Sequence, residues 1–204
     1  MPTTSPSNLA DRVVRMIRSK GILRSRDLDD AGIPRVYLSR LCQSGVIERL
    51  SRGLYTLPGH DLGHLEDLAT VCRRVPKGVI ALISALEFHQ MTTQIAHEVW
   101  LAIGHKARAP RIDYPAIQIV RFSGKAFEFG VQTIIQEGIE LRVYSPAKTV
   151  ADCFRFRNRI GLDVAIEALR ACRADRKASM DELWEAAKVG RMSNVMKPYL
   201  ESVV

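Results

Sequence analysis

The chain has 204 residues, 47% hydrophobic and 25% charged, which is typical of one or two ordinary globular domains. No apolar run approaches the roughly 20 residues of a membrane span, and the opening MPTTSPSNLADR lacks the basic start and apolar core of a signal peptide. Lysine and arginine number 30 against 22 aspartate and glutamate, and this net charge of +8 favours a polyanionic partner.

The basic charge is densest near the N-terminus. Residues 1–58 hold 10 Lys and Arg against 5 Asp and Glu, whereas the other 146 residues hold 20 against 17. The cysteines are far apart and form no C-x-x-C motif: Cys42, Cys72, Cys153 and Cys172. We therefore expect reduced, mostly buried thiols and a cytoplasmic location.

Two helices are predicted before residue 33. The first has apolar residues at i, i+4, i+7 and i+8, which share one helical face: Leu9, Val13, Met16 and Ile17. Gly21 follows it as a stop signal. A second, short helix is expected from Ser25, which can cap its N-terminus, through Leu28, and Gly32 ends it.

A third helix is predicted from Pro34, which suits a first helical turn, to about Gln43. Leu38, Leu41 and Cys42 share a face that should pack inward. The opposite face carries Arg35, Val36, Ser39, Arg40 and Gln43.

The next stretch, VIERLSRGLYTLP, is predicted to form a β-hairpin in which Val46–Leu50 pairs with Leu54–Leu57. Its loop is expected to need the left-handed conformation at Gly53, which glycine adopts without strain. Arg49 and Arg52 lie near the tip, and Tyr55 lies just beyond it.

This order of helices and hairpin is that of a winged helix-turn-helix domain, predicted over residues 1–58. Its third helix has the length and polarity to enter a DNA major groove, and the basic hairpin can lie beside the backbone or the minor groove. Winged helices also serve as protein-docking modules, but exposed basic residues on both elements favour DNA binding. The candidate DNA-binding residues are Arg35, Val36, Ser39, Arg40, Gln43, Arg49, Arg52 and Tyr55.

Residues 61–204 are predicted to form an α+β domain with a small mixed sheet followed by helices. Strands are expected near residues 79–82, 97–103 and 117–121, and as a hairpin of 131–136 with 139–144 around Glu137-Gly138. We expect Ser84 to cap a short helix. Later helices are predicted after Ser145-Pro146, near residues 162–169, and at the capping box that begins with Ser179.

No enzymatic motif is apparent. The sequence has no Gly-rich phosphate loop, no G-x-S-x-G, and no Asp-x-Asp following Gly-Ser, which a nucleotidyltransferase would need. His60 and His64 are four residues apart, but no C-x-x-C or H-E-x-x-H accompanies them, so no metal site is predicted. We therefore interpret the chain as a non-enzyme without a cofactor.

Three segments together give a family resemblance. They are LSRGLYTLP with the helix before it, VIALISALEFHQM, and YSPAKTVADCF. In this order and spacing they resemble the AbiEi-type antitoxins of type IV toxin–antitoxin systems, over roughly residues 9 to 175. The matching motifs are Arg52-Gly53-Leu54-Tyr55, Ser84-Ala85-Leu86, and Ala147, Lys148, Thr149 and Asp152.

The resemblance implies a winged helix that represses its own operon by binding operator DNA. It also implies an antitoxin domain that counters a nucleotidyltransferase-like toxin without a stable complex. It assigns no defined active residue to that domain. Lys148 and Asp152 are four residues apart and can pair on a helix surface. Together with Arg155 and Arg159 they are the candidate residues for antitoxicity.

Other readings stay open at this point. The basic cluster around Arg155 and Arg159 can be a solvated face or a second surface for nucleic acid. The C-terminal domain can instead bind a small effector of a transcriptional regulator. A nuclease guided by a winged helix is a further alternative, although the carboxylates Glu98, Asp113, Glu128 and Glu140 are scattered and no Glu-x-Lys accompanies them.

Overall fold

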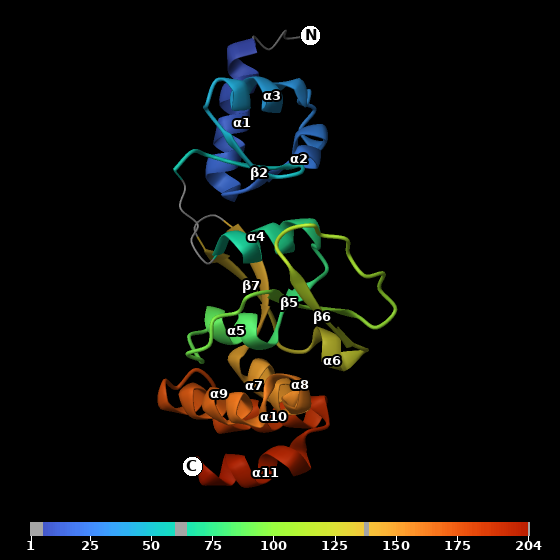
Figure 1. Cartoon of the computed structure of the whole chain (residues 1–204), viewed down its shortest axis with the longest axis vertical. Helices are drawn as coiled ribbons and strands as arrows, with labels where there is room; N and C mark the ends of the chain where they lie inside the picture. The colour runs from blue at the N-terminus through green and yellow to red at the C-terminus, as the bar shows by residue number, and fades with distance from the viewer. Residues whose placement is uncertain (1–5, 60–64, 137–138, 204) are drawn as a thin grey trace. The chain divides into compact units, whose positions relative to one another are not determined.

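The computed structural model describes residues 6–59, 65–136 and 139–203, so the predicted turn at Glu137-Gly138 lies outside the described residues, as do His60 and His64. The chain forms helices and two small sheets, and the predicted α+β class is confirmed (Figure 1). It divides into two compact units. One comprises Met1–Arg74 with Ile134–Leu141, and the other comprises Val75–Thr133 with Arg142–Val204.

The first unit contains the predicted helices and hairpin in the predicted order. The elements of its N-terminal segment are α1 (Pro6–Lys20), β1 (Leu23–Arg24), α2 (Ser25–Asp30), α3 (Val36–Gln43), β2 (Glu48–Ser51), β3 (Leu54–Thr56) and α4 (Leu65–Arg74). The strands form an antiparallel sheet in the order β1-β3-β2. Strand β1 is not among the elements predicted from the sequence, because two residues carry no periodicity.

One apolar core holds this unit together. Val13 and Ile17 from α1 meet Leu28 from α2 and Leu38 from α3 there, and each is at most 2% exposed. Burying each such side chain contributes about 1.5–3 kcal/mol. The apolar faces predicted for the first and third helices are therefore confirmed, and they leave the opposite face of α3 to solvent.

The predicted N-cap of α2 is wrong. Ser25 is the first residue of the helix, and Arg24 occupies the N-cap position. The Arg24 backbone N–H donates to Asp27 Oδ2 at 2.8 Å. A carboxylate inside the helix therefore satisfies the backbone N–H of the N-cap residue. Ser25 instead ties the hairpin to α2, because its backbone N–H donates to the Gly53 carbonyl at 3.0 Å.

The remaining elements form a mixed five-stranded sheet and a set of helices. They are β4 (Val79–Ile80), α5 (Leu82–Phe88), β5 (Val99–Gly104), β6 (Ile117–Phe122), α6 (Lys125–Glu128), β7 (Val131–Gln136), β8 (Ile139–Tyr144), α7 (Pro146–Arg155), α8 (Arg157–Ile160), α9 (Leu162–Ala174), α10 (Met180–Gly190) and α11 (Ser193–Ser202). The strand order is β6-β5-β4-β8-β7. The β4–β5 pair is antiparallel, whereas β4–β8 and β5–β6 are parallel.

Helix α7 is central to the second core. It packs against α5, α9 and α10, and its Val150, Cys153 and Phe154 are fully buried (Figure 1). The Ser145-Pro146 start predicted for it is confirmed, since Ser145 Oγ accepts from the Lys148 backbone N–H. Within the described ranges, no helix is both long and apolar enough to cross a membrane.

The role predicted for Ser84 is wrong. Helix α5 begins at Leu82 with Ala81 as its N-cap, so Ser84 lies inside the helix and is buried. Its hydroxyl accepts a hydrogen bond from the Trp100 backbone N–H at 3.0 Å, which ties α5 to β5. A serine that lies inside a helix and hydrogen-bonds to a neighbouring strand cannot be distinguished from an N-cap serine by its local sequence.

Candidate nucleic-acid interface

The polar face of α3 lies on the surface of the first unit. Leu38 and Leu41 point into the core, while the residues of the opposite face are all exposed: Arg35, Val36, Ser39, Arg40 and Gln43. Val36 is 48% exposed, although it is apolar. This face therefore offers hydrogen-bond donors and one methyl-bearing side chain, the groups that read base edges in a major groove.

Arg35 is held by a carboxylate of the preceding helix. Its Nε donates to Asp29 Oδ1 at 2.9 Å, and its Nη2 donates to Asp29 Oδ2. The hydrogen bond and charge of the guanidinium hold the pKa of Asp29 below its usual range. This pair could not be predicted from the sequence, because the two residues are six positions apart and the turn at Gly32 lies between them.

Arg40 lies beside an aromatic ring on the same helix. Its guanidinium carbon is 5.8 Å from the centroid of the Tyr37 ring, within the range of a cation–π contact. Tyr37 packs against the core, so it limits the freedom of the Arg40 side chain without covering it. A guanidinium placed in this way keeps its hydrogen-bond donors available.

The hairpin places two more arginines on the surface. Arg49 pairs with Tyr55 across β2 and β3, and the register shifts between Arg49 and Ser51. Arg52 follows in the turn, where Gly53 has the predicted left-handed φ of 80°. Arg49 and Arg52 are exposed, whereas Tyr55 is half-buried against the core. Tyr55 is thus bound to the body of the unit, and the two arginines face solvent.

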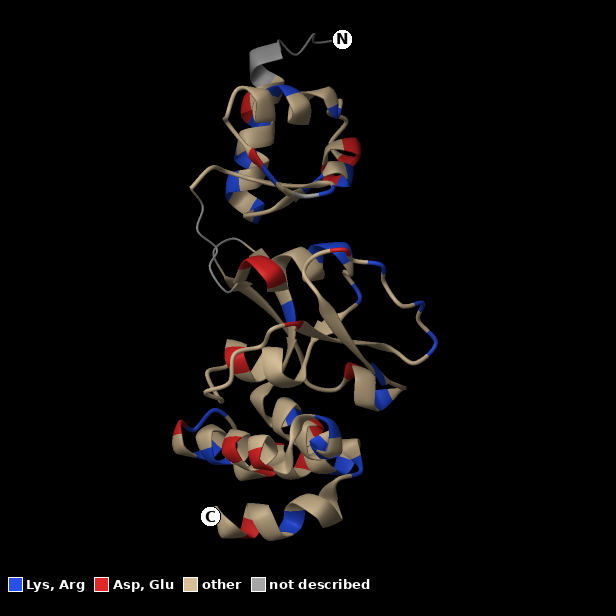
Figure 2. Cartoon of the chain, in the orientation of Figure 1, with Lys and Arg blue, Asp and Glu red and all other residues tan. Residues whose placement is uncertain are grey.

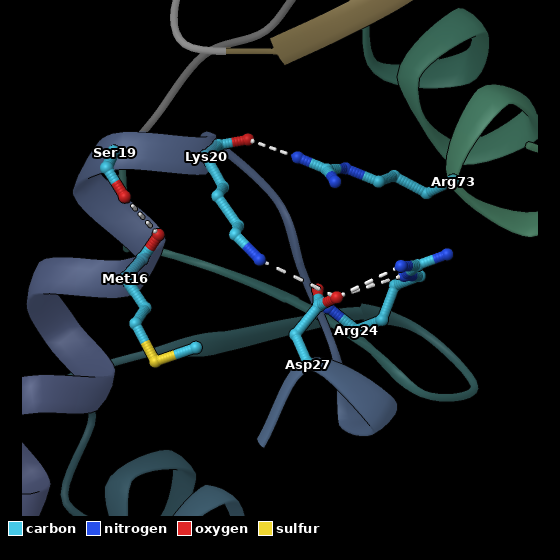
Figure 3. Close-up of polar contacts among 6 residues, drawn as sticks. All are labelled: Met16, Ser19, Lys20, Arg24, Asp27 and Arg73. Carbon is cyan, nitrogen blue, oxygen red and sulfur yellow. Dashed lines mark hydrogen bonds and ion pairs between the residues drawn. The ribbon is translucent and has the colours of Figure 1, made fainter. Parts of the chain in front are cut away.

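A buried carboxylate organises the basic end of α1. Asp27 is 4% exposed and accepts from Arg24 Nη2 at 3.0 Å, with Lys20 Nζ 3.7 Å away (Figure 3). Burial raises the pKa of Asp27, but the hydrogen bonds and charges of Arg24 and Lys20 outweigh it and lower the pKa. Arg73 donates to the Lys20 carbonyl at 3.0 Å.

Figure 2 shows how the charges of the first unit are divided. Over residues 6–59, basic residues occur on α1, α2, α3 and the hairpin, and three of the five acidic residues, Asp27, Asp29 and Asp30, lie on α2. Two of these three are the partners just described, Asp27 and Asp29, so they hold arginine side chains in place.

Two of the candidate residues on α7 are buried in the core, although they were expected on a helix surface. Lys148 and Asp152 pair as predicted, but they are wholly buried and not on a helix surface. Lys148 Nζ lies 4.2 Å from the Phe122 ring centroid and 4.6 Å from that of Tyr144. Burial raises the pKa of Asp152 to about 6 despite the ion pair, and it lowers the pKa of Lys148. The pair is inaccessible to a macromolecular partner.

Arg155 and Arg159 differ from that pair because both are exposed. Arg155 lies 5.4 Å from the Phe122 ring centroid, on the ring that Lys148 also approaches. Arg159 stands over Trp100, at 4.7 Å from the ring centroid, and donates to Gln118 Oε1. The structure therefore brings Lys148 and Arg155 together at Phe122, with Asp152 paired to Lys148, and it places Arg159 at Trp100.

No group of histidine, cysteine, aspartate and glutamate side chains capable of holding a metal ion is found among the described residues. The four cysteines are free thiols, and all but Cys42 are buried. Burial raises the pKa of Cys153 and Cys172, which keeps these thiols protonated and unreactive.

Comparison with known proteins gives one family and one fold. Residues 11–58 match the model of the family described as "Transcriptional regulator, AbiEi antitoxin". No curated protein matches. Among solved structures, the chain is similar to the RV2827C protein from Mycobacterium tuberculosis, with a TM-score of 0.59 and 15% identity. The similarity covers 98% of this chain and 81% of that one, and at this identity it concerns the fold alone.

Proposed function

We propose that the chain is a cytoplasmic, sequence-specific DNA-binding repressor whose first unit is a winged helix-turn-helix. One observation carries the proposal: α3 exposes Arg35, Ser39, Arg40 and Gln43 opposite a buried leucine face, within the segment that matches an antitoxin regulator family. Helices of this kind enter the major groove, and a basic hairpin beside them contacts the backbone.

The two sets of arginines are proposed to act differently. Arg35 and Arg40 on α3 would read base edges, together with Val36, Ser39 and Gln43. Arg49 and Arg52 on the hairpin would contact phosphates, which fixes the register of the protein but carries no sequence information. Tyr55 would orient the hairpin from its half-buried position rather than touch DNA, because its ring packs on the core.

Single substitutions test this division by fluorescence anisotropy, with a duplex from upstream of the coding sequence and a scrambled duplex. Arg40→Ala should weaken binding to the upstream duplex about 5- to 150-fold, because a bidentate base contact contributes about 1–3 kcal/mol. Arg52→Ala should weaken binding to both duplexes alike. Lys188→Ala, which removes one exposed charge from α10, is the matched control. If Arg40→Ala and Arg52→Ala both bind as the wild type does, the assignment fails.

We further propose that the chain is the antitoxin of a type IV system and represses its own operon. Its functional partner would be a nucleotidyltransferase-like toxin that it counters without a stable complex. The family match of residues 11–58 and the resemblance of YSPAKTVADCF support this proposal. This proposal assigns no catalytic role to the chain.

Within the antitoxin proposal, the four candidate residues on α7 and α8 divide by exposure. Lys148 and Asp152 would support antitoxicity by holding α7 in place, since they are buried. Arg155 and Arg159 would present the acting surface. In a growth assay with co-expressed toxin, the double variant Arg155→Ala/Arg159→Ala should lose protection while Lys188→Ala retains it. Protection equal to that of the wild type would contradict the assignment.

A second candidate function is a regulator whose C-terminal helices bind a small effector. It is supported by a shallow groove along α9, lined by Asp163, Ile166, Glu167, Arg170, Ala171 and Ala174. A thermal-shift screen of small molecules would favour this function if a compound raised the melting temperature of the wild type but not of Ile166→Trp, which fills the groove.

A further inference from the structure

Asp29 of α2 makes an unusually complete contact with Arg35. Arg35 Nε and Nη2 donate to the two carboxylate oxygens, so both oxygens of Asp29 are used by one guanidinium. The contact lies on the surface, with the Arg35 side chain 58% and the Asp29 side chain 46% exposed. An exposed ion pair of this kind adds little to stability, so its presence calls for a different role.

The geometry of the guanidinium leaves three of its five N–H donors available. Arginine has five N–H groups in one rigid plane, and the contact with Asp29 uses one edge of that plane, formed by Nε and Nη2. The edge formed by Nη1 and Nη2 carries one proton of each nitrogen, and the other Nη1 proton points to the third side of the plane. Because the group is planar, this second edge points away from Asp29. It is the edge that can donate two parallel hydrogen bonds to a second acceptor.

The position of Arg35 suits that second contact. It directly precedes Val36, the first residue of α3, and it lies on the face shared with Ser39 and Arg40. Residues near the N-terminus of a recognition helix are the ones that contact base edges. A guanine presents two acceptors, O6 and N7, in the major groove, and a bidentate arginine is the most common way to read them.

We infer that Asp29 is a positioning residue, which fixes the guanidinium of Arg35 in the orientation that reads one guanine of the operator. The inference rests on the proposed DNA-binding function and adds to it the base recognised and the residue that orients its reader. A long arginine side chain that is already held loses less conformational freedom on binding, so the correct base gains more than an incorrect one.

If Asp29 did not orient Arg35, its removal would have the opposite effect on DNA binding. Asp29 carries a negative charge next to the proposed interface, and it would repel phosphates. Its removal would then strengthen binding to every DNA duplex. Asp30, its neighbour on α2, is exposed and has no ion pair within the described parts of the chain. Asp30→Ala is therefore the matched control, since it removes the same charge from the same helix end.

The experiment begins with a duplex that the wild-type chain selects from a random-sequence pool. Binding to this duplex and to a scrambled one is measured by fluorescence anisotropy for the wild type, Asp29→Ala, Asp29→Asn, Asp29→Glu, Asp30→Ala and Arg35→Ala. Asp29→Ala and Asp29→Asn should lower the ratio of selected to scrambled affinity about tenfold, because a guanidinium that is no longer held loses part of its bidentate base contact. Asp29→Glu should restore part of it, and Asp30→Ala should leave it unchanged.

Two further measurements make the test specific to the contact between Arg35 and a guanine. Asp29→Ala should have little added effect in the Arg35→Ala background, since both act through one contact. Replacement of the recognised guanine by 7-deazaguanine, which lacks the N7 acceptor, should weaken wild-type binding but not that of Arg35→Ala. Circular dichroism of each variant ensures that the folded protein is compared.

The inference is overturned if Asp29→Ala strengthens binding to both duplexes as Asp30→Ala does, or if 7-deazaguanine has no effect on the wild type. In either case the wild-type preference for the selected duplex keeps the proposed function intact. If the wild type selects no sequence at all, the proposed function fails, and this inference fails with it.

Discussion

At the scale of single residues, the same side-chain types serve opposite purposes in the two units. Arg35 and Arg40 stay on the surface, where a carboxylate and an aromatic ring restrict them. Lys148 and Asp152 on α7 are instead fully buried, and Lys148 Nζ lies close to the rings of Phe122 and Tyr144. Asp152 Oδ2 has no hydrogen-bond partner within the described residues, so this ion pair is costly to bury.

The first prediction concerns this buried pair. Lys148→Met or Asp152→Leu alone should destabilise the second unit by about 3–5 kcal/mol, because each leaves an unpaired charge in the core. The double variant should be more stable than either single variant. Urea unfolding followed by tryptophan fluorescence measures this, since both tryptophans, Trp100 and Trp184, belong to the second unit. Single variants that lose less than about 1 kcal/mol would show that the pair is solvated.

The second prediction concerns Asp27 and pH. The pKa of Asp27 is lower in the folded chain than its ordinary value of 3.8. The unfolded chain therefore takes up the proton first as pH falls, and the stability that Asp27 contributes is present above pH 3.8 and is lost below it. In urea unfolding followed by circular dichroism, Asp27→Asn should be less stable than the wild type at neutral pH.

That difference between the wild type and Asp27→Asn should shrink as the pH falls below about 4. The relevant transition is the one without a tryptophan signal, because the first unit contains neither tryptophan. A difference of the same size at pH 3 and pH 7 would mean that the contribution of Asp27 to stability does not depend on its charged partners.

The residues of the α3 face could be predicted from the sequence, because a 3.6-residue period separates Leu38 and Leu41 from their polar neighbours. The burial of Lys148 could not. It depends on β6, β8 and the backbone at Gly130, where a Cβ would lie only 2.7 Å from Lys148 Cβ. Such long-range packing has no local signal. The pairing of Asp29 with Arg35 likewise depends on the turn between two helices.

At the scale of elements, capping signals were reliable where the cap and its partner are close in sequence. The box at Ser179 is present as predicted: Ser179 Oγ accepts from the Glu182 N–H at 3.2 Å, and Glu182 Oε2 accepts from the Ser179 N–H at 2.7 Å. Ser25 and Ser84 fit the same local pattern but bond other elements instead. A serine before an apolar run therefore predicts a helix better than it predicts the first residue of that helix.

The third prediction tests this cap. Ser179→Ala should destabilise the second unit by about 1 kcal/mol, since it removes the acceptor for an N–H group that no other group of the helix satisfies. Ser179→Thr, which keeps the hydroxyl, should lose only a small part of that. Both are measured by tryptophan fluorescence in urea, because Trp184 lies on α10 itself. Equal midpoints for Ser179→Ala and the wild type would contradict the prediction.

At the scale of the whole molecule, the sequence was sufficient for the class of fold but not for its topology. The period-2 runs predicted the strands at residues 131–136 and 139–144, which are β7 and β8. The order β6-β5-β4-β8-β7 could not be predicted, because β4 is only two residues long and pairs in parallel with a strand some 60 residues away. The domain boundary near residues 58–61 stays a prediction.

The central claim is that the chain recognises a DNA sequence, and one measurement tests it most directly. The wild-type chain is offered a random-sequence duplex pool, and its affinities for the selected and a scrambled duplex are measured by anisotropy at several salt concentrations. The account predicts a consensus that is bound about a thousandfold more tightly than the scrambled duplex, with affinities for both that fall steeply as salt rises. No consensus, or equal affinity for both duplexes, would contradict it.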